Sequence, residues 1–142
     1  MSARSIKLGF TLIELLVVIS IIGILAVLVS ANLNSARSRA RDAVRKSDIK
    51  NIQTALRLYY NDKGSYPATV TFGSEWKIGT TTYMNKVPQD PLSPDQIYKY
   101  TIDPVDTDLY TLSACLENSS DKQGVAAVGI TCPSSWMFQV SQ

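Results

Sequence analysis

Residues 9–36 read GFTLIELLVVISIIGILAVLVSANLNSA. The 22 residues from Leu15 to Ala36 carry no charge. As a helix they would extend about 33 Å, close to the ~30 Å thickness of the hydrocarbon core of a bilayer. A secretory signal peptide has a shorter apolar region of ~7–15 residues, and a chain of 142 residues has little room to bury such a helix. The stretch therefore predicts a helix that spans a membrane.

The helical pattern continues into a polar segment. Neither Pro nor Gly occurs between Ile24 and Lys63, and apolar residues recur every three or four positions, as one face of a helix requires. These residues are Ala40, Val44, Ile49, Ile52, Leu56 and Tyr59, broadened by Ala43, Ala55 and Tyr60. We expect one helix over residues 10–62, with a membrane and assembly part at 10–36 and an amphipathic basic stem at 37–62, ending at Gly64 as its cap.

The remaining residues, 63–142, predict a small β-rich head. Pro88 and Pro91 exclude a central strand around them, and residues 65–96 are expected to be a loop with short irregular pieces. Strands are predicted at 97–102, 109–116, 125–131 and 136–140, with the polar segment 117–124 as the turn of a hairpin. The expected fold class is α+β, a long N-terminal helix packed on a small antiparallel sheet.

Charge and composition exclude several classes of function. The chain has no histidine, which removes Ser-His-Asp and Cys-His catalysis, and we predict no enzymatic activity. Residues 37–57 carry seven Lys or Arg against two acidic residues, whereas residues 63–142 carry five against eight. The basic stem is either a solvated helix face or a surface for acidic groups of neighbouring heads, lipid or cell-wall polymers. No basic groove accompanies the aromatic residues of the head, so no specific nucleic acid is predicted.

Glu14 is the unusual residue of the apolar run. A carboxylate within a membrane helix costs up to ~3 kcal/mol at the centre and less near the interface, so that it is a candidate functional residue. Taken alone, Glu14 could instead reach the headgroups, or favour the helix N-terminus through the helix dipole.

The context of Glu14 favours a specific function. A short leader (1–9) with Arg4 and Lys7 ends in Gly9, and Phe10, Thr11 and Glu14 follow at the start of the uncharged run. This arrangement resembles the N-terminal signal of type IV pilins and type II secretion pseudopilins. The resemblance implies that a prepilin peptidase cleaves between Gly9 and Phe10 and N-methylates Phe10. It also implies that Glu14, helped by Thr11, meets the amino group of Phe10 on a neighbouring subunit.

The same resemblance implies partners and a location. The subunit would form a polymer with other copies and minor pilins, driven by an inner-membrane platform protein and an assembly ATPase. It would first be a single-pass protein of the inner membrane, in contact with lipid and with its head outside the cytoplasm, and then part of a cell-surface or periplasmic filament. Five Lys or Arg at residues 37–46 conflict with this orientation by the positive-inside rule. The sequence does not separate a pilus from a secretion pseudopilus, and a membrane-anchored binding module that never polymerises is the alternative.

Two further sites are expected in the head. Cys115 and Cys132 are an even pair that fits one disulfide in an oxidising compartment, with two free thiols as the alternative. Major pseudopilins often bind calcium between late strands, and the oxygen-bearing residues of the predicted turn here are Glu117, Asn118, Ser119 and Asp121. Calcium needs 6–8 oxygen ligands, and polar turn residues are common without any metal.

Overall fold

The fold is described from a computed structural model that covers residues 10–142. The chain divides into two compact units, one ending at Arg37 and the other comprising Ser38–Gln142. The first unit contains the N-terminal part of helix α1, and the second contains the C-terminal part of that helix with all six strands. The predicted leader, residues 1–9, lies outside the described residues.

Helix α1 comprises Leu12–Lys63, which confirms the predicted continuous helix to within two residues at each end. The helix ends at Gly64, whose φ is 75° and whose N–H donates to the carbonyl oxygen of Tyr60 at 2.7 Å. A left-handed residue directly after the last turn is the usual glycine cap. Lys63 places a positive charge in that last turn, where the helix dipole favours it.

A short hairpin lies in the segment that was expected to be loop. Strands β1 (Trp76–Ile78) and β2 (Thr81–Met84) pair antiparallel, and Gly79, between them, has a φ of 61°. The expectation was wrong because the periodic pattern is too short to see: the strands have three and four residues, below the length at which alternation is informative. Tyr59 of α1 stacks on Trp76 with ring centroids 5.5 Å apart, which holds the hairpin to the helix.

The larger sheet has four antiparallel strands in the order β3-β4-β6-β5. Its strands are β3 (Lys99–Ile102), β4 (Tyr110–Cys115), β5 (Val125–Ala126) and β6 (Trp136–Ser141). Strand β5 is far shorter than predicted, because it ends at Ala126, and Gly129 further along takes a φ of 71°. The predicted hairpin over residues 117–124 is also wrong, because β4 and β5 both pair with β6 and not with each other.

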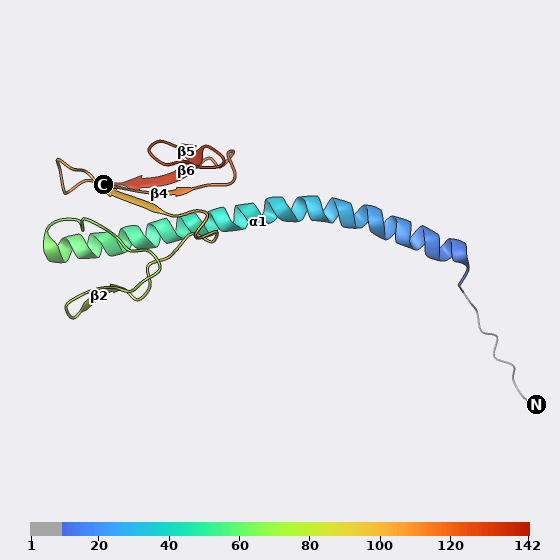
Figure 1. The fold of residues 1–142 in the computed structure, drawn as a ribbon, viewed down its shortest axis with the longest axis horizontal. Helices are drawn as coiled ribbons and strands as arrows, with labels where there is room; N and C mark the ends of the chain where they lie inside the picture. The colour runs from blue at the N-terminus through green and yellow to red at the C-terminus, as the bar shows by residue number, and fades with distance from the viewer. Residues whose placement is uncertain (1–9) are drawn as a thin grey trace, which may run out of the picture. The chain divides into compact units, whose positions relative to one another are not determined.

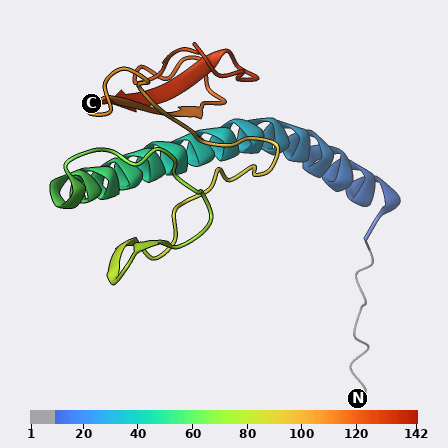
Figure 2. The same ribbon diagram turned by 60° about the vertical axis from the view of Figure 1, so that its left-hand side comes forward.

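The core of the second unit lies between the sheet and α1. The four-stranded sheet runs along one side of the C-terminal part of α1, and the β1–β2 hairpin lies on the opposite side (Figures 1 and 2). From the helix, Ile49, Ile52 and Leu56 are fully buried against Leu112 of β4 and Leu116 directly after it. Strand β4 is central in this sheet and almost wholly buried, so the packing confirms the predicted pilin-like α+β class.

The buried face of the helix matches the predicted stripe from Ile49 onwards but differs from it before that residue. Val44 was expected to face the core but is 47 % exposed, and Ala40 and Ala43 are exposed as well. In their place Asp42 and Arg45 are buried, at 2 % and 0 % exposure. Arg45 is four residues before Ile49 and seven before Ile52, and it therefore lies in phase with the buried apolar residues. The basic stem is thus not a uniformly solvated face.

Candidate functional site

The first unit begins with a capping box formed by Thr11 and Glu14. Thr11 is the residue before α1, and the N–H of Glu14 donates to its Oγ1 at 3.3 Å. In return Glu14 Oε2 accepts the N–H of Thr11 at 2.8 Å and its hydroxyl at 2.7 Å. The pattern Thr-x-x-Glu is a known start signal of helices, in which two orphan N–H groups are satisfied reciprocally. Only one carboxylate oxygen, Oε2, takes part, and Oε1 is not used by the capping box.

An apolar surface follows the capping box along α1. Its large side chains between Leu12 and Leu33 are between 46 % and 81 % exposed, and Phe10 is 89 % exposed. Within the described residues, α1 is long and apolar enough to cross a membrane by length and composition. A core helix of a soluble protein could have the same composition, but its apolar residues would be buried. This surface therefore needs lipid or other protein chains to cover it.

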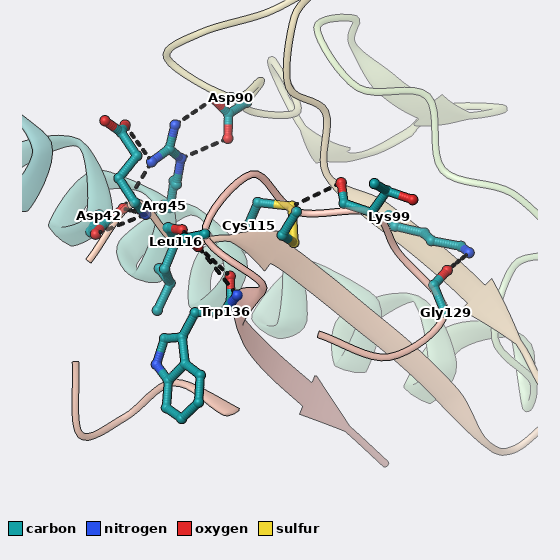
Figure 3. Close-up of a disulfide and its surroundings, with 12 residues drawn as sticks. Asp42, Arg45, Asp90, Lys99, Cys115, Leu116, Gly129 and Trp136 are labelled. Carbon is teal, nitrogen blue, oxygen red and sulfur yellow. Dashed lines mark hydrogen bonds and ion pairs between the residues drawn. A yellow bond between two sulfur atoms is a disulfide. The ribbon is translucent and has the colours of Figure 1, made fainter. Parts of the chain in front are cut away.

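The second unit carries the two cysteines at one end of the large sheet. Cys115, the last residue of β4, is bonded to Cys132, 17 positions further along the sequence, with the Cα atoms 5.3 Å apart (Figure 3). Met137 of β6 is buried against this bond. The bond ties the irregular segment after β5 to the central strand, which compensates for the brevity of β5.

The buried Arg45 is the centre of an ion-pair network (Figure 3). Its Nε and Nη2 donate to the two oxygens of Asp90, at 2.7 and 3.0 Å. Its Nη1 donates to Asp42 and to Glu117, at 2.8 Å in each case. Burial alone would lower the pKa of Arg45, but the hydrogen bonds that it donates to Asp90, Glu117 and Asp42 outweigh this effect, and the pKa is raised. Arg45 therefore stays charged and joins three segments: the helix, the loop after β2 and the loop after β4.

The loop after β4 has further bonds to the helix. Asp42 accepts the backbone N–H groups of Glu117 and Asn118, each at 2.9 Å at its shortest. Arg41 donates from Nε and Nη2 to the two carboxylate oxygens of Glu117, at 2.7 and 2.5 Å. Lys46 donates to Asp121 at 2.6 Å. The segment 117–121 is thus fixed to residues 41–46 of α1 by three basic side chains and one carboxylate.

Comparison with known proteins identifies the family of this chain. Residues 4–30 match the prokaryotic N-terminal methylation motif, and residues 32–127 match the family described as type II secretion system (T2SS), protein G. The chain belongs to the protein G family. Proteins of this family are the major pseudopilins, structural subunits that form the pseudopilus filament. The predicted filament subunit is thereby confirmed, and the system is type II secretion.

Individual relatives of this protein G family member support the assignment to this family. It is 37 % identical over 118 residues to the type II secretion system core protein G of Pseudomonas aeruginosa, covering 75 % of this chain and 82 % of the relative. It is 36 % identical to that of Aeromonas hydrophila, covering 66 % and 78 %. The similarity to the type IV major pilin protein PilA of Myxococcus xanthus, 38 %, covers only 41 % of this chain and 26 % of the pilin. No solved structure matches.

The side chains predicted as calcium ligands in this family member are engaged by other groups or exposed. The carboxylate of Glu117 is engaged by Arg41 and Arg45, and that of Asp121 by Lys46. The Asn118 side-chain oxygen accepts the N–H of Ser120 at 3.1 Å, and Ser119 is exposed. In residues 10–142 no group of three or more acidic, cysteine or histidine side chains has metal-binding geometry. Oxygens that already face cations do not fit the 6–8 ligands that calcium requires.

The structure places the other predicted site residues as follows. Thr11 and Glu14 are brought together, Phe10 directly precedes them, and Cys115 and Cys132 are bonded, whereas Gly9 lies outside the described residues. The sequence interpretation missed the network of Arg45 with Asp42 and Asp90. A signal existed, because Arg45 is in phase with Ile49 and Ile52. A basic segment was nevertheless expected to face either solvent or acidic groups of other molecules, and not carboxylates of its own head.

The network makes the stability of the head dependent on pH. The hydrogen bond from Arg41, with help from Arg45, lowers the pKa of Glu117 from 4.5 to about 2. The folded state therefore binds fewer protons at Glu117 than the unfolded state does. The resulting stabilisation of the folded state amounts to roughly 3 kcal/mol. It is complete above about pH 4.5 and is lost as the pH falls towards 2. Asp121 acts in the same direction through Lys46, whereas burial raises the pKa of Asp48 and opposes the effect.

We expect the free energy of unfolding, measured by denaturant titration, to fall more steeply between pH 5 and pH 3 for the wild type than for Glu117→Gln. Glu75→Gln removes an exposed carboxylate outside the network and should keep the wild-type pH dependence. Equal slopes for the wild type and Glu117→Gln would contradict the assignment.

Proposed function

We propose that this protein is matured by cleavage between Gly9 and Phe10, N-methylated on Phe10, and polymerised through α1 into a periplasmic pseudopilus. The observation that carries the proposal is the uncovered apolar surface of α1, which begins at a carboxylate four residues after Phe10. The match of residues 4–30 to the methylation motif supports the maturation step.

Assembly follows from the physical chemistry of that surface. Before assembly, lipid covers the apolar side chains of α1, and afterwards the same side chains pack against other copies. Cleavage creates a free amino group on Phe10. A carboxylate and an ammonium group that pair in an apolar environment remove much of each other's desolvation cost. Glu14 of one subunit and Phe10 of its neighbour would make this pair only in the correct register.

The capping box makes Glu14 suitable for this function. Because Thr11 holds Oε2 from two donors, the carboxylate is fixed at the helix start before any neighbour arrives. Oε1 can then accept the amino group of a second subunit without breaking the cap. Preorganisation of this kind reduces the entropy lost on association.

The proposal includes partners that act on the subunit. A prepilin peptidase would cut the leader, and glycine at position 9 suits an extended backbone in its active site. An inner-membrane platform protein and an assembly ATPase would extract subunits from lipid, and minor pilins would join the polymer. The same mechanism places the head outside the cytoplasm, where an oxidising compartment permits the bond between Cys115 and Cys132.

Maturation is tested by the mass of the N-terminal peptide from membranes of wild-type cells. We expect a peptide that begins at Phe10 and carries one added methyl group. Gly9→Ala should accumulate the uncleaved precursor, because a side chain at this position would hinder the close approach of the backbone to the peptidase. A wild-type peptide that still contains residues 1–9 would refute the proposed maturation.

A further inference from the structure

In the second unit, three basic side chains of α1 hold the loop that leads from β4 to β5. Arg41 is 31 % exposed and Lys46 20 % exposed at their side chains, and Arg45 is fully buried. Their acidic partners in the loop are Glu117 and Asp121. A structural calcium ion has a comparable effect, because it binds oxygen ligands from distant parts of a chain and holds them together.

We propose that Arg41, Arg45 and Lys46 take the place of a structural metal in this head, so that the loop over residues 117–124 is held without any divalent cation. The resemblance to major pseudopilins implies calcium in this part of the fold. The residues of this loop do not fit a calcium ion, because the carboxylates of Glu117 and Asp121 already contact basic side chains at 2.5–2.8 Å.

The charges of the side chains around the loop support the proposal that basic residues replace a metal ion. Asp42, Asp90, Glu117 and Asp121 bring four negative charges to this cluster, and the three basic side chains neutralise most of them. A divalent ion placed beside Glu117 would lie next to two guanidinium groups and be repelled. The guanidinium of Arg45 also has directional donors, which fit the two oxygens of Asp90 as a spherical ion does not.

The backbone of the loop is fixed by the same cluster. Asp42 accepts the N–H groups of Glu117 and Asn118, and Arg45 holds Asp42 at 2.8 Å. Trp136 of β6 adds a bond from its indole Nε1–H to the carbonyl oxygen of Asp121, at 3.0 Å. Each of these bonds lies within the second unit and requires no metal.

The first test compares the full chain, purified in non-ionic detergent, in excess EGTA and in excess CaCl₂. Both tryptophans of the chain, Trp76 and Trp136, lie in the head, so their fluorescence reports its thermal unfolding. We expect Tm to change by less than about 1 °C, whereas a site filled at about 100 times its Kd would raise Tm by roughly 10 °C. Elemental analysis should find no calcium retained per chain after dialysis.

A calcium-dependent rise in Tm would overturn the proposal if Glu117→Gln abolished that rise. If Glu117→Gln retained the rise, calcium would act elsewhere on the head and the loop would remain held by its basic partners.

The second test measures hydrogen exchange of loop peptides over residues 117–124 in EGTA. The double variant Arg41→Gln/Lys46→Gln removes two partly exposed partners and leaves the buried Arg45 intact, so it should still fold. We expect loop exchange to be roughly fivefold faster than in the wild type. The control Arg39→Gln/Lys50→Gln removes the same charge from exposed positions of the same helix and should leave loop exchange unchanged. Wild-type exchange in the first variant would overturn the proposal.

Discussion

Filaments should fail to incorporate a Glu14→Gln subunit, although this subunit is inserted in the membrane and cleaved as the wild type is. Glutamine can complete a capping box with Thr11 as glutamate does, so the helix start is kept and only the charge is lost. The amino group of Phe10 on the neighbouring subunit would then enter an apolar contact without a counter-charge. We expect incorporation to fall at least about tenfold.

The measurement is the ratio of variant to wild-type subunit in isolated filaments when both are expressed together. Thr11→Ala is the matched control, because it removes the hydroxyl that caps the helix, at a cost of about 1 kcal/mol, and keeps the Glu14 charge. If charge pairing governs assembly, Glu14→Gln is the more severe variant. If helix capping governs it, Thr11→Ala is at least as severe. Glu14→Ala, which removes both functions, should also be excluded from filaments.

Arg45→Gln should lower the free energy of unfolding of the head by about 3–5 kcal/mol, which corresponds to a fall in Tm of more than 10 °C. The reason is that Asp90 and Asp42, at 4 % and 2 % exposure, would keep their desolvation cost and lose the guanidinium that offsets it. The loss of bonds is secondary, since ordinary hydrogen bonds contribute only about 1 kcal/mol each.

The measurement is denaturant unfolding of the full chain in detergent, followed by tryptophan fluorescence. Lys50→Gln removes an exposed charge five residues further along the same helix and should change stability by less than about 0.5 kcal/mol. Arg45→Lys keeps the charge but cannot bind Asp90 through two donors, so we expect an intermediate loss. A stability of Arg45→Gln equal to that of Lys50→Gln would show that the network is not a source of stability.

Much of the fold was predictable because its signals are local and long. The uncharged run from Leu15 to Ala36 and the absence of Pro or Gly up to Lys63 suffice for the helix and its end. The strands of the large sheet were located near their true positions, at 99–102, 110–115 and 136–141. The hairpin of β1 and β2 and the brevity of β5 were not predicted, because β1 and β5, of three and two residues, are too short to show a period.

The residues of the candidate site were likewise predictable only where their signal is local in the sequence. Phe10, Thr11 and Glu14 could be singled out from sequence, since their spacing along one chain is the motif itself. Even so, the reciprocal hydrogen bonds of Thr11 and Glu14 were overlooked, although Thr-x-x-Glu before an apolar run is a readable signal.

The sequence by itself determined that this protein has one long helix whose first half is uncovered apolar surface, and that a carboxylate stands at the start of that half. Both follow from the order of residues over a few helical turns, because helical hydrogen bonds and side-chain spacing are local. Only the tertiary structure decided which side of the stem is buried. Helical phase places Arg45 on the same face as Ile49 and Ile52, but phase alone does not bury a charged side chain. Arg45 lies inside because Asp90 and Glu117, 45 and 72 residues away, supply the charges that make its burial favourable.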